Sequence, residues 1–111
     1  MTITEEKERG IIILHLHNGE AKTRDLEPLL EILKKKIEVF STEIIINLKE
    51  INSIDSSGIG VLAAFKNTLS EVNGRLVLAQ PTENVANVLK ITQTDKVFII
   101  TPTIEEALKK F

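Results

Sequence analysis

The chain alternates short runs of β-branched residues and leucine with longer stretches whose apolar residues recur every three or four positions. The short runs predict strands at residues 11–17, 44–48, 75–79 and 97–100, and a weaker strand from Thr2 to about Lys7. A turn at residues 8–10 would pair this weaker strand with the first strong one. With helices in between, the order is β-β-α-β-α-β-α-β-α, which predicts a mostly parallel sheet with right-handed crossovers.

Alternation along the predicted strands separates the two faces of this sheet. One face is wholly apolar and consists of Ile12, Leu14, Leu16, Ile44, Ile46, Leu48, Leu76, Leu78, Phe98 and Ile100. The other face is mixed and consists of Ile11, Ile13, His15, His17, Glu43, Ile45, Asn47, Arg75 and Val77. We therefore predict an α/β fold with a mixed, mostly parallel sheet and helices packed mainly on one face. Either the amino-terminal strand or another subunit could cover Ile13, Ile45 and Val77, and the sequence does not choose between them.

The helical stretches carry start and stop signals. Asp25 is the predicted N-cap of the first helix, which puts Pro28 in the first turn, where a missing amide hydrogen costs nothing. The second helix runs from about Ser57 to Val72 and ends at the left-handed stop 73–74. The inward stripes are Leu26, Leu29, Leu30, Leu33, Ile37 and Phe40 in the first helix and Ile59, Leu62, Phe65, Leu69 and Val72 in the second.

Two threonines predict the starts of the remaining helices. Thr82 follows a proline and is the expected N-cap of a third helix that buries Val85, Val88 and Leu89. Residues 103–106 read Thr-Ile-Glu-Glu, a capping box that opens a short last helix burying Ala107 and Leu108.

Composition narrows the class of protein. The 111 residues are 42% apolar and 27% charged, which indicates one soluble domain over residues 1–111. The net charge is −2 and no basic stripe is present, so nucleic-acid binding is not expected. No apolar run approaches the roughly 20 residues that cross a bilayer, and the acidic amino end does not resemble a secretion signal. We expect a cytoplasmic protein without a membrane segment; with no cysteine, it has no disulfide framework.

The loop at residues 52–60, Asn-Ser-Ile-Asp-Ser-Ser-Gly-Ile-Gly, is the most informative segment. It follows a buried strand and opens a helix, the edge where open α/β sheets place their sites and where a helix terminus stabilises an anion. Capping alone would explain a serine or an aspartate before a helix. One cap needs one side chain, however, and Asp55, Ser56 and Ser57 supply three, an excess that indicates function.

The loop does not fit the common catalytic motifs. It lacks the Gly-Lys-Ser/Thr ending of a phosphate loop and the third glycine of a dinucleotide fingerprint, and no histidine follows it as a hydrolase triad requires. His15 and His17 are neighbours on one strand face and could supply half of a metal site. The nearby acids Glu20 and Asp25 do not lie at a recognisable metal-ligand spacing from them, so both histidines are expected to be solvated. We predict no enzymatic activity, no metal and no cofactor.

The segment from Ile46 to Leu48, with the Ile-Asp-Ser-Ser-Gly-Ile-Gly-Val-Leu run at residues 54–62, resembles the central motif of STAS domains, specifically the bacterial anti-sigma-factor antagonists. The likeness continues through residues 73–78, 85–89, 95–98 and 105–108, so it covers nearly the whole chain from Ile11 onward. Two segments depart from the family pattern, at Gly19-Glu20-Ala21 and at Gln93-Thr94. The first lies in a region that helps form the family's partner surface, so the partner can differ.

The resemblance implies a phosphorylation switch. In such proteins an anti-sigma factor that is itself a serine kinase modifies the first serine after the aspartate, and a serine phosphatase of the metal-dependent class removes the phosphate. Only the unmodified form binds the kinase and frees the sigma factor. Carried onto this chain, Ser56 is the phosphoacceptor, and Asp55, Ser57, Gly58 and Ile59 form the partner-binding loop.

Other functional classes fit less well. A receiver domain phosphorylated on aspartate needs an acidic pair after the first parallel strand and a lysine after the last parallel strand. In this chain the first position reads His-Asn-Gly (residues 17–19) and the last reads Thr-Pro (residues 101–102). A STAS subunit that senses a ligand or scaffolds a signalling complex remains an alternative reading.

Overall fold

The structure is a computed structural model that describes residues 2–17, 19–21 and 23–111. A five-stranded sheet has the strand order β1-β2-β4-β6-β7. Its strands are β1 (Thr2–Glu8), β2 (Ile11–His17), β4 (Glu43–Asn47), β6 (Arg75–Ala79) and β7 (Ile99–Thr101). β1 pairs antiparallel with β2, and every other pair in this sheet is parallel. The predicted mixed, mostly parallel α/β sheet is confirmed.

A second, two-stranded sheet pairs β3 (Gly19–Ala21) with β5 (Ile51–Ile54). The sequence pattern did not predict either strand, because three or four residues are too few to show alternation. β5 leads directly into the loop at Asp55, so this small sheet sets where that loop begins.

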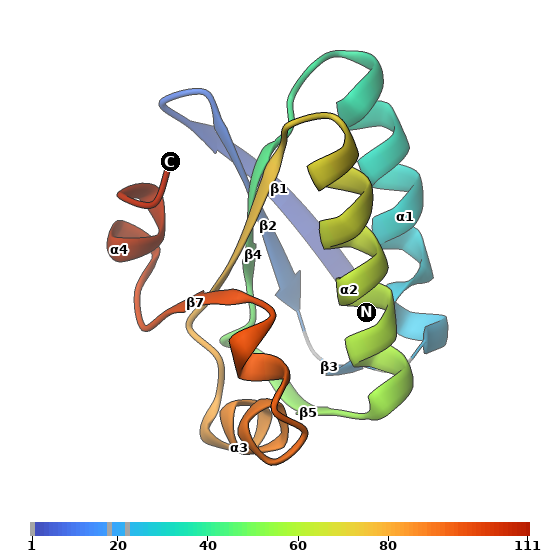
Figure 1. The fold of residues 1–111 in the computed structure, drawn as a ribbon, viewed down its shortest axis with the longest axis vertical. Helices are drawn as coiled ribbons and strands as arrows, with labels where there is room; N and C mark the ends of the chain where they lie inside the picture. Colours follow the sequence, from blue (N-terminus) through green and yellow to red (C-terminus); the bar gives the residue numbers. More distant parts are fainter. Residues whose placement is uncertain (1, 18, 22) are drawn as a thin grey trace.

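The helices are α1 (Thr23–Glu38), α2 (Ser56–Glu71), α3 (Glu83–Ile91) and α4 (Ile104–Leu108), with a 3-10 turn, η1, at Thr94–Lys96. α1 and α2 pack side by side on one face of the large sheet, α4 lies on the other face, and α3 lies at the end near β5 (Figure 1). The predicted caps are confirmed for α3 and α4, since the Thr82 hydroxyl accepts the Val85 amide and the Thr103 hydroxyl accepts the Glu106 amide.

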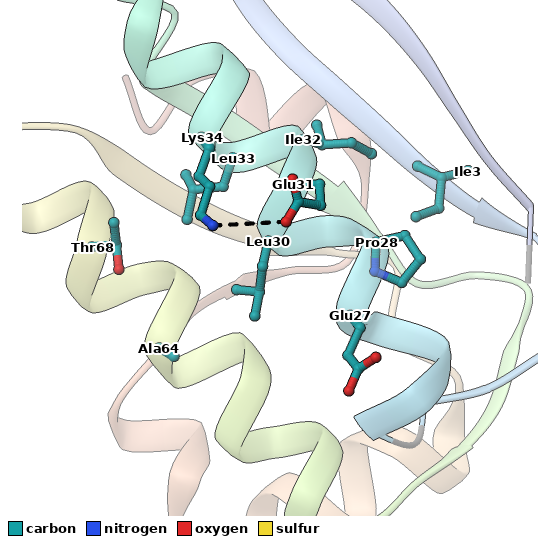
Figure 2. Close-up of a pocket in the computed structure, with 10 residues that line it drawn as sticks. All are labelled: Ile3, Glu27, Pro28, Leu30, Glu31, Ile32, Leu33, Lys34, Ala64 and Thr68. Atoms are coloured by element: carbon teal, nitrogen blue, oxygen red, sulfur yellow. Dashed lines mark ion pairs between the residues drawn. The ribbon is translucent and has the colours of Figure 1, made fainter.

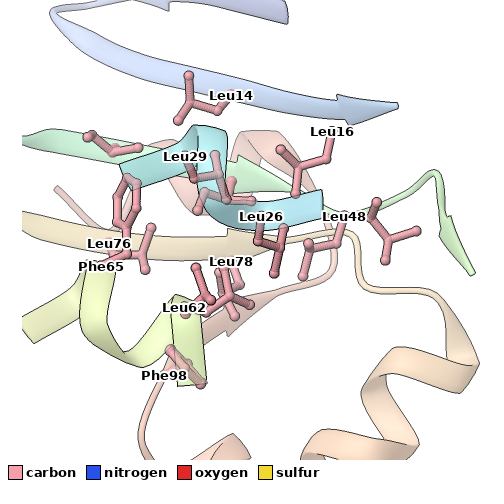
Figure 3. Close-up of a cluster of buried hydrophobic side chains, with 14 of the residues drawn as sticks. Leu14, Leu16, Leu26, Leu29, Leu48, Leu62, Phe65, Leu76, Leu78 and Phe98 are labelled. Carbon is pink, nitrogen blue, oxygen red and sulfur yellow. The ribbon is translucent and has the colours of Figure 1, made fainter. Parts of the chain in front are cut away.

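The main core lies between the sheet and helices α1 and α2 (Figure 3). The predicted apolar face supplies most of its strand side chains, with Ile46 of β4 paired between Leu14 of β2 and Leu78 of β6. The helices contribute fully buried side chains, among them Leu26, Leu29, Leu62, Phe65 and Leu69. The prediction that one apolar face carries the core is confirmed.

The other face has a smaller core that the chain covers itself. Ile11, Ile13, Ile45, Val77 and Ala79 are buried beneath Ala107 and Leu108 of α4. α4 therefore provides the cover, in place of the two possibilities considered from the sequence. The last helix is only five residues long, and its two apolar side chains gave no sign of which face they cover.

Three local expectations were also wrong. α1 begins at Thr23, three residues before the start at Leu26 that an Asp25 cap would give, so Pro28 lies inside the helix and not in its first turn. Phe40 is 90% exposed, because α1 ends at Glu38 and Phe40 takes the left-handed position beyond it (φ 59°). Val72 is likewise 42% exposed, although it was expected to face inward.

The last strand begins later than expected. η1 occupies the preceding residues, so Val97 is 48% exposed, whereas Phe98 still reaches the main core. The stop of α2 is confirmed: Asn73 is left-handed (φ 60°), and the Gly74 amide donates to the Leu69 carbonyl at 2.7 Å.

Candidate functional site

Asp55 closes the amino end of α2. It follows β5 with an extended backbone (φ −109°, ψ 177°), and its Oδ1 accepts the Gly58 amide at 2.8 Å. The same oxygen accepts the Ser57 hydroxyl at 2.7 Å. Asp55 is therefore the N-cap, and it also holds the second residue of the helix.

Ser56 is the first residue of α2, and its side chain is exposed. No hydrogen bond joins its hydroxyl to any other residue that the structure describes. The two adjacent serines therefore differ chemically: the Ser57 hydroxyl is engaged with a carboxylate, and the Ser56 hydroxyl is available to a partner or reagent.

The other two residues of the predicted partner-binding loop, Gly58 and Ile59, lie beneath this surface. Gly58 is buried, and Ile59 is 6% exposed as a member of the main core. Ile59 thus anchors the first turn of α2 to the sheet. Asp55, Ser56 and Ser57 form the exposed part of the loop.

β5 and α3 hold the loop in place. The Thr82 hydroxyl donates to the Ile51 carbonyl at 2.8 Å while accepting the Val85 amide, so one side chain joins the start of α3 to β5. In Figure 1 the start of α2, β5 and α3 lie at the same end of the molecule. This is the edge at which the parallel strands β4 and β6 end, as expected for a site in an open α/β sheet.

The two histidines of β2 are more ordered than the sequence suggested. His15 bonds Glu6 and Asn47, and His17 bonds Thr4 and Glu50. Side-chain exposures of 23% and 28% show that both are only partly solvated. Within the described part of the chain, no group of three or more ligating side chains is placed to hold a metal ion.

A surface hollow lies away from the loop, over α1 (Figure 2). Leu30 of α1 lies opposite Ala64 and Thr68 of α2, while Ile3 lies beside Pro28 and Ile32 on the other side of α1. The hollow measures about 1010 Å³, and its charged lining is Glu27, Glu31 and Lys34. Glu31 and Lys34 form an exposed ion pair at 3.7 Å, so the hollow offers no buried reactive group.

Residues 3–107 match the family model described as the STAS domain. The chain belongs to the STAS domain family. None of the helices in the described ranges is both long and apolar enough to cross a membrane.

Named relatives of this STAS chain include proteins from Thermotoga. It is 38% identical, over 68 residues, to a Thermotoga neapolitana protein named as a homolog of a "putative anti-sigma factor antagonist". That match covers 61% of this chain and 60% of the relative, so the aligned part spans less than two thirds of the relative's length.

Solved structures share the fold over almost the whole chain. The crystal structure of a "putative anti-sigma factor antagonist" from Thermotoga maritima is 25% identical, with a TM-score of 0.87 over 97% of this chain and 92% of that one. The Bacillus protein SpoIIAA in its phosphorylated form is 22% identical, with a TM-score of 0.73 over 98% of both chains. The latter likeness, at this identity, concerns the fold alone.

Proposed function

We propose that this STAS protein is an anti-sigma factor antagonist switched by phosphorylation of Ser56. The observation that carries the proposal is the contrast between the two serines. The exposed Ser56 hydroxyl bonds no described residue, whereas the Ser57 hydroxyl is held by Asp55 at 2.7 Å. Support also comes from the relatives named as antagonists. SpoIIAA, which shares the fold, has been solved in unphosphorylated and phosphorylated forms.

In this proposal the unmodified protein binds an anti-sigma factor that is also a serine kinase. Asp55, Ser56 and Ser57 supply the exposed contact surface, and Gly58 and Ile59 set its shape from below. A phosphate on Ser56 would add a charge of about −1.5 to −2 beside the Asp55 side chain. Repulsion and desolvation at the interface would then cost about 2–4 kcal/mol of affinity, or roughly 30- to 700-fold.

The domain itself tolerates that charge. Ser56 is the first residue of a 16-residue helix, and the positive end of the helix dipole favours a negative group there. Phosphorylation would therefore change the binding surface without unfolding the domain. A serine phosphatase of the metal-dependent class would restore the unmodified form.

The direct test is to locate the modified residue. The protein is incubated with ATP and each purified serine-kinase anti-sigma factor of the source organism, and fragment spectra then assign the phosphate. We expect one phosphate, on Ser56, and no modification of the Ser56→Ala variant. A phosphate on Ser57 or Ser53, or no transfer from any of these kinases, would refute the assignment.

We further propose that the protein is a non-enzymatic, cytoplasmic module forming one domain over residues 1–111. Around Asp55 and Ser56 the described side chains include no histidine base and no metal cluster that could activate a nucleophile. ATPase, esterase and phosphatase assays should give no turnover above the buffer rate. Turnover that disappears in the Ser56→Ala variant would contradict the proposal.

A further inference from the structure

His15 and His17 lie on the part of the mixed sheet face that continues beyond the small core under α4. His15 Nε2 lies 2.6 Å from a Glu6 oxygen, and its Nδ1 lies 2.8 Å from Asn47 Nδ2. His17 Nδ1 lies 2.7 Å from a Glu50 oxygen, and its Nε2 lies 2.8 Å from the Thr4 hydroxyl. The network joins the β1–β2 hairpin to β4 and to the turn between β4 and β5.

One backbone contact fixes the orientation of the Asn47 amide group. The Lys49 amide can only donate, and it lies 3.0 Å from Asn47 Oδ1. The amide group of Asn47 therefore turns its NH₂ toward His15. Because that NH₂ donates, this arrangement requires His15 Nδ1 as the acceptor, with the ring's single hydrogen on Nε2, where it donates to Glu6.

Protonation of His15 would break this arrangement. A hydrogen on Nδ1 would face the Asn47 NH₂, donor against donor. Asn47 could rotate its amide to present Oδ1, but the NH₂ would then face the Lys49 amide and the same conflict would move there. Asn47 is only 3% exposed, so water has little access to satisfy the displaced group.

His17 has no such conflict. Its Nε2 faces the Thr4 hydroxyl, which can rotate to donate or to accept, and its Nδ1 faces a carboxylate. Among the described residues, the titratable groups facing His15 are Glu6, which favours the added proton, and the His17 ring, whose centroid is 6.2 Å away. The conflict is therefore specific to the Asn47 side of His15.

We propose that His15 and Asn47 form a proton-sensitive latch on the turn between β4 and β5. The latch is closed while His15 is neutral and opens when the ring takes up a proton, because Asn47 can no longer serve both His15 and Lys49. An imidazole is the side chain that changes charge between about pH 5 and 8, so this is the range in which the latch is tested. The turn leads through β5 to Asp55, so opening would loosen the connection to the loop at Asp55.

The test is hydrogen exchange of the Lys49 amide in ¹⁵N-labelled protein at pH 7.5 and 5.5, corrected for the intrinsic pH dependence of exchange. We expect protection to fall about two- to tenfold at the lower pH, the effect of losing one hydrogen bond. Nitrogen chemical shifts at high pH should show His15 with its hydrogen on Nε2. Equal protection at both pH values, or a hydrogen on Nδ1, would overturn the proposal.

Three variants separate the latch from general acid sensitivity. His15→Gln cannot titrate and should abolish the fall in protection, whereas His17→Gln is the matched control and should retain it. Asn47→Asp presents two acceptor oxygens, so protection should no longer fall at pH 5.5. A fall that persists unchanged in His15→Gln would show that the latch is not at His15, whatever the outcome of phosphorylation at Ser56.

Discussion

The Asp55 carboxylate holds the Ser57 hydroxyl at 2.7 Å. Ser56 lies between Asp55 and Ser57 in the chain, and its side chain forms no hydrogen bond with any other described residue. One capping aspartate thereby engages the hydroxyl of one exposed serine and leaves the hydroxyl of the other available. This local arrangement underlies the proposed choice of phosphoacceptor and the first two predictions.

We expect Asp55 to be the residue whose side chain stabilises the amino end of α2. Asp55→Ala removes the acceptor of both the Gly58 amide and the Ser57 hydroxyl, so the free energy of unfolding should fall by about 0.5–2 kcal/mol. Ser56→Ala is the matched control and should change it by less than about 0.5 kcal/mol, because Ser56 is not the cap. Urea denaturation of the three proteins gives the comparison, and an equal loss in both variants would mean that Asp55 is not the main cap.

Charge at position 56 should weaken partner binding in steps. Ser56→Ala removes only an exposed hydroxyl and should bind the kinase like the unmodified protein. Ser56→Asp adds one charge, so binding should weaken, but less than with the phosphate's charge of nearly −2. Calorimetric titration of the four forms at low salt gives the order, and wild-type affinity in the phosphorylated protein would rule out Ser56 as the switch.

Two glycines should respond oppositely to alanine. A Cβ on Gly74 would lie 2.6 Å from the Thr42 carbonyl oxygen and 2.8 Å from the Thr42 Cβ, so Gly74→Ala should destabilise the fold by about 1–3 kcal/mol. Gly60 lies exposed within α2, with nothing within 4 Å of an added Cβ. Gly60→Ala should therefore stabilise the fold by up to about 1 kcal/mol. Thermal and urea denaturation of both variants checks the signs.

Phe40 should be a poor residue for its position. It is 90% exposed and left-handed, and the adjacent Ser41 amide closes the end of α1 by donating to the Lys36 carbonyl at 2.8 Å. A glycine suits that position, so Phe40→Gly should raise the free energy of unfolding by about 0.5–1 kcal/mol. Phe40→Ala keeps the Cβ and serves as the control. If alanine stabilises as much as glycine, exposure of the ring, not the backbone, is the cause.

Local signals in the sequence determined much of this protein. Alternation in residues 11–17, 44–48 and 75–79 assigned each side chain to a face, because the two-residue period of a strand permits no other assignment. Thr82, Thr103 and Asn73 marked helix ends correctly, because each acts on backbone groups a few residues away. The loop at Asp55 could be singled out for the same reason.

Contacts between distant residues were decided only by the tertiary structure. β3 pairs with β5, about 30 residues later in the chain, and no local signal encodes that pairing. The sequence predicts that Leu108 is buried. That it packs over Ile13 and Ile45 depends on the direction in which the chain leaves the last strand. His15 and Asn47 are separated by 31 intervening residues, and only the parallel register of β2 and β4 brings them together. A sequence pattern specifies whether a segment is a helix or a strand and which of its faces is apolar. Which segments become neighbours depends on how all helices and strands bury their apolar faces together.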